Sequence, residues 1–146
     1  MSAEIHIFPN PLTSSGTFTA VVQDNAGVPT DVIEASLEFR VDCQWDIDPI
    51  TAGLLGGTWH VDLYAESLGG GFEGRVGGEF VNVTPGQTNY AATIIVPANT
   101  FPNDPSVHPL NDQSHVFKMV VVLTHHNGNV TTSLCALQEG PAVLVR

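Results

Sequence analysis

Two ligand-forming side chains stand two residues apart in one stretch of alternating sequence. On a strand, His60 and Asp62 would share a face and could jointly hold a metal ion. No third ligand has a predictable position, and the alternation of this stretch assigns both residues to the solvated face of a sheet. We therefore do not expect a metal at this pair.

Four aspartates in predicted strand ends and loops form a second candidate cation site: Asp46, Asp48, Asp104 and Asp112. Calcium takes roughly six to eight oxygen ligands, which loop carboxylates and carbonyls could supply. The spacing of a calcium-binding loop is absent, and Asp48 and Asp104 each precede a proline, an arrangement typical of turns. We predict turn residues here, and neither a metal nor another cofactor.

No motif for nucleophilic or phosphate chemistry is present. Cys43 falls on an apolar row, no serine stands in a G-x-S-x-G elbow, and Gly69–Gly71 lacks the lysine and helix of a phosphate loop. The adjacent His125 and His126 would point to opposite faces of a strand, so a pH-sensitive contact is the chemistry they could supply. The sequence predicts a protein that is not an enzyme.

The compartment follows from the first residues. MSAEIHIFPNPL has neither the basic nor the apolar region of a signal peptide, which predicts a cytoplasmic protein with Cys43 and Cys135 reduced. If a leader had been removed, the protein would be extracellular. The two cysteines could then form a disulfide, and the Asn-Val-Thr sequons at Asn82 and Asn129 could carry glycans.

The charge balance excludes some partners. Fifteen acids face four bases, a formal net charge of −11, so nucleic acid and anionic membranes are repelled. No run approaches the roughly 18 apolar residues of a membrane span, so we expect no membrane insertion. A basic protein, a cation or a neutral glycan remains compatible with this surface, whose charge could also serve solubility alone.

Period-two alternation between turn residues predicts the secondary structure. The candidate strands are Ile5–Phe8, Thr17–Gln23, Leu37–Asp48, Thr58–Glu66, Glu79–Val83, Thr88–Val96, His115–Thr124, Asn129–Leu137 and Ala142–Val145. A single helical turn is expected at Val32–Ala35, and a type I′ turn centred on Asn127-Gly128 should join the last long pair. About seven to nine strands in one 146-residue chain predict a single all-β, antiparallel β-sandwich.

Two of these strands have distinctive patterns. In "LEFRVDCQWDID", Leu37 to Asp48, the odd positions should form the core and the even positions a solvated acidic face, and Asp48-Pro49 should end the strand. The stretch "VFKMVVVL", Val116 to Leu123, is apolar on both faces. Such a strand is central, covered on its second face, or part of an interface.

The cysteines and tryptophans resemble those of an immunoglobulin-like sandwich over roughly Thr17 to Val145. Cys43 and Trp59 match the strand-B cysteine and strand-C tryptophan of that fold. Cys135 departs from the pattern because it falls on the last hairpin strand, and Ser133 stands where the corner tyrosine of that fold would be. The resemblance implies a sandwich domain at 17–146 that follows an N-terminal arm at 1–16. It also implies that Cys43 and His60 lie on strands of different sheets. It implies no function.

We expect a non-enzymatic module for protein interaction or self-assembly. Its surfaces would be strand edges, the loop Pro97–Ser114 and the second face of Val116–Leu123, and the N-terminal segment could add a strand to a neighbouring subunit. The candidate interaction residues are Phe101, His108, Val116, Lys118, Val120 and Val122. The alternative is a glycan- or calcium-dependent binding module that uses loops and an exposed aromatic, Tyr64 or Phe101.

Overall fold

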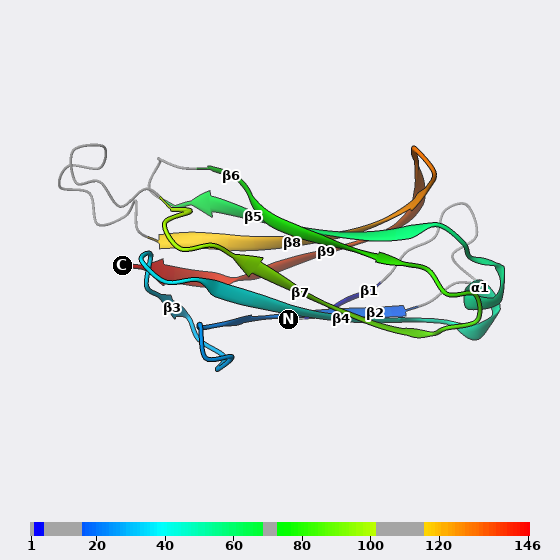
Figure 1. Ribbon diagram of the computed structural model, residues 1–146, viewed down its shortest axis with the longest axis horizontal. Helices are drawn as coiled ribbons and strands as arrows, with labels where there is room; N and C mark the ends of the chain where they lie inside the picture. Colours follow the sequence, from blue (N-terminus) through cyan, green and yellow to red (C-terminus); the bar gives the residue numbers. More distant parts are fainter. Residues whose placement is uncertain (1, 5–15, 69–72, 102–115) are drawn as a thin grey trace.

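Two β-sheets packed face to face form the molecule (Figure 1). The computed structural model describes residues 2–4, 16–68, 73–101 and 116–146. The four-stranded sheet has the order β1 (Ser2–Glu4), β2 (Gly16–Gln23), β4 (Phe39–Ile47) and β7 (Asn89–Val96). The five-stranded sheet has the order β3 (Val32–Ile33), β9 (Val130–Val145), β8 (Val116–Asn127), β5 (Thr58–Ser67) and β6 (Glu73–Asn82). The predicted all-β class is confirmed.

A short helix, α1 (Pro49–Leu54), lies at the end of the sandwich away from the C-terminus. Within the described ranges, no helix has the length and apolar character needed to cross a membrane.

The order of strands is that of an immunoglobulin-like fold. The consecutive strands β4 and β5 lie in different sheets, β7 pairs with β4, and β8 pairs with β5 and β9. In the lettering of that fold, β4 is strand B, β5 is strand C and β7 is strand E. Strands β8 and β9 are F and G. Cys43 therefore lies on strand B and Trp59 on strand C, and the acids of β4 are in the other sheet from His60, as the resemblance implied.

The alternation of β4 produces the predicted core row. Its buried side chains are Phe39, Val41, Cys43, Trp45 and Ile47. The prediction is wrong for Leu37, which is 44% exposed, because the strand begins only at Phe39. Of the three explanations for the apolar strand β8, the structure shows the central position, between β5 and β9.

The expected helical turn at Val32–Ala35 is wrong. Val32 and Ile33 instead form β3, which runs parallel to the end of β9. Arg146 N donates to Ile33 O at 3.0 Å, and Leu144 N donates to Asp31 O at 2.9 Å. The edge of β9 supplies hydrogen-bond partners for the backbone of this segment. This contact is a tertiary effect, so the local conformational preferences of the residues do not predict it.

Asp48 and Pro49 end β4 as expected, but they also begin α1. The Asp48 carboxylate accepts hydrogen bonds from Thr51 N at 2.9 Å and Thr51 Oγ1 at 2.7 Å. Aspartate at the N-cap followed by proline is a favoured start of a helix. The signal was therefore present in the sequence.

The C-terminal strands differ from the prediction in two respects. The stretches Asn129–Leu137 and Ala142–Val145 belong to one long strand, β9, with register shifts against β8. Asn127 pairs with Val130, so the connecting residues are Gly128 and Asn129, one position later than expected. The candidate strand Ile5–Phe8 and most of the loop Pro97–Ser114 lie outside the described residues.

Gly57 lets the link between α1 and β5 pass close to the end of β8. Its φ is +88°, and a Cβ atom there would overlap the carbonyl oxygen of His126. Gly86 has a similar φ of +86°, but a Cβ atom added to it would meet no atom within 4 Å. A side chain at Gly86 would therefore add backbone strain alone, whereas one at Gly57 would add the same strain and a steric overlap.

We expect Gly57→Ala to lower the free energy of unfolding by about 2–4 kcal/mol, because strain and steric overlap add. Gly86→Ala should cost only about 1 kcal/mol, the left-handed strain alone. Urea unfolding followed by tryptophan fluorescence measures both. Equal losses in the two variants would contradict the close approach at Gly57.

Candidate interaction surface

The outer face of the five-stranded sheet presents its side chains in rows across four strands. Pairing of β6, β5, β8 and β9 defines two central rows, the first of Gly78, Asp62, Val122 and Leu137 and the second of Arg75, Tyr64, Val120 and Glu139. Side chains directly opposite each other on an antiparallel sheet lie on the same face and touch. The rows therefore form one continuous surface.

Four apolar side chains are contiguous in these rows: Tyr64, Val120, Val122 and Leu137, here named the outer band. Tyr64 stands opposite Val120, and Val122 stands opposite Leu137. Tyr64 is 38% and Leu137 56% exposed, whereas neighbours cover most of Val120. The outer band exists because β8 is apolar on both faces although only its inner face meets the core.

Charged side chains flank the outer band. Arg75 Nε donates to Asp62 Oδ1 at 2.6 Å, and Lys118 Nζ lies 2.9 Å from Glu139 Oε2. The Glu139 carboxylate raises the pKa of Lys118, against a smaller opposing effect of desolvation. All four bases of the chain pair with acids, the other two through Arg40–Glu38 and Arg146–Glu34.

One row of this face has like charges opposite each other. Glu66 on β5 pairs in register with Glu73 on β6, and both are exposed. Opposed like charges destabilise a sheet. Lys118 stands opposite Glu66 on β8 and interacts with it, but its ion pair is with Glu139. The rim of the outer band therefore has an excess of negative charge.

The structure brings together four of the six candidate interaction residues. Val116, Lys118, Val120 and Val122 alternate along the outer face of β8. Phe101 is not a surface residue: it is 3% exposed and packs with its ring centre 4.7 Å from that of Phe117. Its apolar ring fills the core where the chain leaves β7. His108 lies outside the described residues.

Sequence patterns did not single out Leu137, the most exposed member of the outer band. Leu134 and Ala136 occupy the inward positions of β9, which sends Cys135 and Leu137 outward. The register of β9 against β8 decides this, and it contains shifts that the alternation of β9 alone does not reveal.

The two candidate cation residues within the described ranges, Asp46 and Asp48, are not part of a metal site. In the part of the chain that the structure describes, no group of three or more histidine, cysteine or acidic residues could hold a metal ion. Asp46 accepts from Thr17 N at 2.9 Å and from its hydroxyl, and Asp48 caps α1. Asp104 and Asp112 lie outside the described residues. His60 and Asp62 share a face as predicted, but Asp62 binds Arg75.

Cys43 and Cys135 are free thiols, so the pairing considered for an exported protein is not what the structure shows. Cys43 faces the core from the four-stranded sheet, and Cys135 is exposed on the five-stranded one. Burial, with a smaller contribution from Asp42, raises the pKa of Cys43 to about 12. Cys43 is therefore an unreactive core residue.

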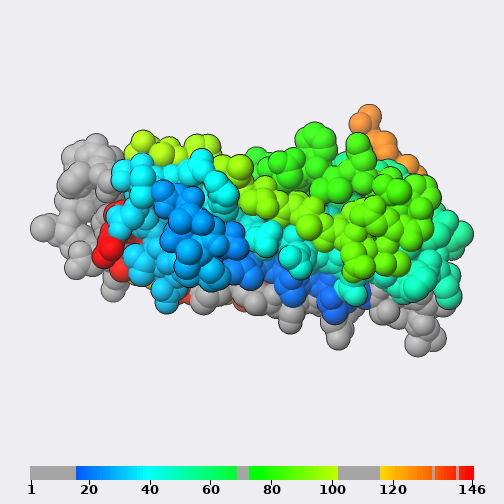
Figure 2. Space-filling model, turned by 60° about the horizontal axis from the view of Figure 1, so that its bottom comes forward, coloured from blue at the N-terminus to red at the C-terminus, as the bar shows by residue number. Residues whose placement is uncertain are grey.

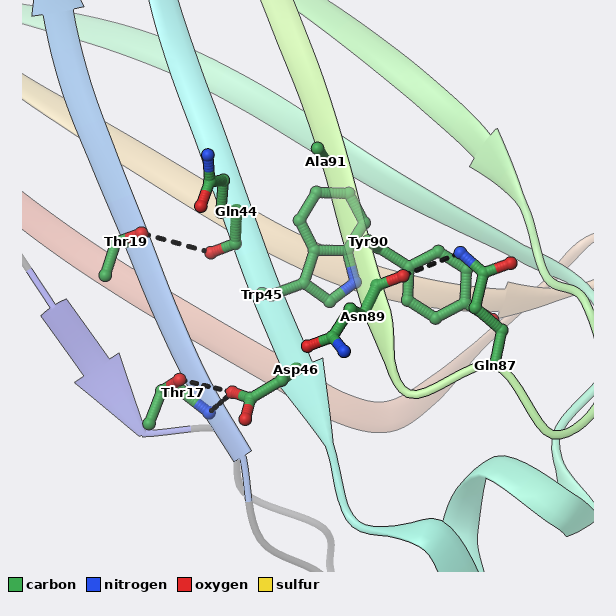
Figure 3. A pocket seen from close by; sticks show the side chains of 9 residues that line it. All are labelled: Thr17, Thr19, Gln44, Trp45, Asp46, Gln87, Asn89, Tyr90 and Ala91. Atoms are coloured by element: carbon green, nitrogen blue, oxygen red, sulfur yellow. Dashed lines mark hydrogen bonds between the residues drawn. The ribbon is translucent and has the colours of Figure 1, made fainter.

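A polar hollow of about 660 Å³ lies on the opposite, four-stranded sheet, where β2, β4 and β7 run side by side (Figures 2 and 3). Its lining residues are Thr17, Thr19, Gln44, Trp45, Asp46, Gln87, Asn89, Tyr90 and Ala91. Hydroxyl and amide groups of this kind suit a neutral polar ligand such as a sugar. Trp45 and Tyr90 are only 2% and 5% exposed, however, so they offer no aromatic face for a sugar ring.

His125 is buried behind the outer face and fixes the end of β8. Its Nε2 lies 2.5 Å from Gly56 O, and its Nδ1 lies 2.8 Å from Thr132 Oγ1. A carbonyl only accepts, so in the neutral ring Nε2 carries the hydrogen. The Thr132 hydroxyl, which also donates to His125 O at 3.2 Å, shares its single hydrogen between that carbonyl and Nδ1. Burial is the main cause that lowers the pKa of His125, and the bond to Gly56 opposes it.

Thiol labelling should distinguish the two cysteines. We expect a disulfide-exchange reagent to modify Cys135 rapidly in the native protein and Cys43 only after unfolding, because thiolate character and access decide the rate. The readout is one thiol per chain in buffer and two in urea. A count of zero in buffer and in urea without reductant would mean that the cysteines are joined.

The stability of the protein should fall in acid through His125. A histidine whose pKa is lowered on folding contributes stability that is complete above its unfolded pKa near 6.5 and is lost as the pH falls through the folded value. The slope is at most about 1.4 kcal/mol per pH unit for one proton. Urea unfolding between pH 7.5 and 5 should show a weaker pH dependence for His125→Gln than for the wild type; equal slopes would contradict this assignment.

Comparisons with known proteins support the fold alone. No family model and no curated protein matches this chain. A β-glucosidase from Erythrobacter marinus is similar in structure, with a TM-score of 0.53 and 14% identity over 91% of this chain. A β-glucosidase from Listeria innocua matches 88% of the chain at 11% identity, with a TM-score of 0.46.

The chain spans only 16% of the length of each of these β-glucosidases. An immunoglobulin-like protein from Pseudomonas aeruginosa matches over nearly the whole of both chains, 99% of this one and 98% of the other, at 14% identity and a TM-score of 0.32. The likeness to the Erythrobacter marinus enzyme, which shows the fold alone, concerns a small part of a much larger chain.

Proposed function

We propose that this chain is a non-enzymatic interaction module that binds a protein partner on the outer band. The observation that carries the proposal is the contiguous apolar surface formed by Tyr64, Val120, Val122 and Leu137 on a sheet face that nothing else in the described chain covers. Isolated apolar residues on a surface need no explanation, but contiguous ones framed by charges are typical of interaction sites.

The charges around the outer band favour a basic partner. Glu66 and Glu73 oppose each other, the nearby Lys118 is bonded to Glu139, and the whole chain carries a net charge of −11. A second copy of the chain would bring the same acids to the interface. A partner with an apolar centre and lysine or arginine at its rim would relieve the repulsion and gain steered association.

The alternative function, glycan- or calcium-dependent binding, has less support. The polar hollow lacks an exposed ring, Phe101 is in the core, and Tyr64 belongs to the outer band. The likeness to β-glucosidases is consistent with a module role, since in those enzymes the matching part is 16% of the chain. It carries no glucosidase activity to this chain.

A synthetic probe tests the proposal without an identified partner. An octapeptide that alternates leucine and lysine presents an apolar row and a basic row when extended, and we expect it to bind the wild type. Leu137→Gln should weaken binding at least about tenfold, because covering one leucine contributes about 1.5–3 kcal/mol. Fluorescence anisotropy of the labelled peptide measures the affinity.

The matched control is Ile95→Gln. Ile95 is 54% exposed on the four-stranded sheet, nearly as exposed as Leu137 on the other, so it controls for a general loss of apolar surface. It should bind the probe like the wild type, and a leucine–glutamate octapeptide should bind at least about tenfold more weakly than the lysine probe. Equal effects of the two substitutions would refute the outer band as the site. Analytical sedimentation tests for a second copy as the partner. A concentration-dependent dimer that the Leu137→Gln variant does not form would show that the partner is a second copy of the chain and not a basic protein.

A further inference from the structure

Three rings continue the outer band at the end of the sheet where β8 and β9 turn. The ring centres of His60 and His126 are 3.9 Å apart, and those of His60 and Phe80 are 6.1 Å apart. Phe80 is 65% exposed. These residues, here named the histidine corner, form an aromatic row one step along β5 and β6 from the row that contains Val122.

Strand register holds the two imidazoles together. Thr58 pairs with His126 and His60 with Thr124, which makes His60 and His126 diagonal neighbours on one face. The ring of His126 lies between two hydroxyls, with Nε2 3.0 Å from Thr124 Oγ1 and Nδ1 3.4 Å from Thr131 Oγ1. The contact between the rings is therefore built into the fold and does not depend on a chance rotamer of one exposed side chain.

Several charged or titratable groups face this corner. On β5, Asp62 lies two residues from His60 but is bonded to Arg75 of β6. On β6, the neighbouring acid Glu79 stands opposite the inward-pointing Val61, so it lies on the other face of the sheet from Phe80. On β9, Cys135 stands opposite Thr124.

The third histidine, His125, lies behind the sheet and packs against Trp59. The pKa of His60 is lowered mainly by desolvation and next by the neighbouring His126. The Asp62 carboxylate raises this pKa, and His125 lowers it further. The lowered pKa favours the neutral form of the His60 ring. In acid it gains positive charge that is only partly offset by a carboxylate.

We propose that the histidine corner makes docking on the outer band acid-sensitive: the ring row of Phe80, His60 and His126 extends the apolar contact, and protonation of His60 within this row repels the basic partner and weakens its binding. This inference rests on the proposed function of the outer band. Its physical basis is that a cation on the His60 ring, whose centre is 3.9 Å from that of His126, repels any lysine placed beside this row.

The leucine–lysine octapeptide tests the proposal at pH 7.5 and 5.5. Free aspartate and glutamate titrate near pH 4 and lysine near pH 10, so imidazole is the side chain whose charge changes most within this window. We expect the wild type to bind the probe about tenfold more weakly at pH 5.5. The variant His60→Gln/His126→Gln should lose less than about twofold, since it has no imidazole to charge at the corner.

The outcomes separate this inference from the proposed function. If Leu137→Gln leaves binding at pH 7.5 unchanged, the outer band is not the site. If Leu137→Gln weakens binding but the double glutamine variant loses as much affinity in acid as the wild type, only the acid sensitivity is refuted. Wild-type binding that is equal at both values of pH refutes it as well.

A second measurement does not involve the probe. Imidazole proton resonances followed by pH titration should show a higher pKa for His60 in His126→Gln than in the wild type, because one of the causes that lower it is gone. An unchanged His60 titration would show that the two rings do not interact. The single variant His60→Gln replaces the double variant if the latter fails to fold.

Discussion

The contact between Trp45 and Trp59 is the interaction on which the rest of the structure depends. These rings, one from each sheet, have centres 5.9 Å apart; Tyr90 stacks on Trp45 at 5.7 Å, and His125 meets Trp59 at 5.2 Å. Because side chains alternate along a strand, Trp59 pointing inward sends His60 outward, with Asp62 and Tyr64 following it. The same alternation at His125 sends His126 outward. The core therefore determines the residues of the outer face.

The two outer faces of the sandwich have different chemistry. The four-stranded sheet exposes hydroxyl and amide groups around a shallow hollow, and its acid Asp46 is bonded to Thr17. The five-stranded sheet exposes a contiguous apolar band with an acidic rim and an aromatic corner that can gain charge. Each base of the chain already forms an ion pair with an acid, so the surface keeps an excess of negative charge. That asymmetry is why we propose binding at one face only.

Most strands could be predicted from alternation because a half-buried strand records its two environments directly in the sequence. The errors occur where a second factor acts. Val32 and Ile33 are extended because β9 offers them an edge, Leu37 is exposed because its strand begins two residues later, and Phe101 is buried because the core has room for its ring. The start of α1 at Asp48 was present in the sequence as a capping signal.

The sequence by itself determined the all-β class, the core row of β4, the opposite orientations of His125 and His126 and the acidic character of the surface. These properties depend on residue type and a period of two, which are local. Only the tertiary structure decided that Leu137 joins Val122, that His60 stacks on His126 and that Cys43 and Cys135 remain apart. Each of these contacts depends on which strands are neighbours and in what register they pair, and a shift of one residue would reverse every face.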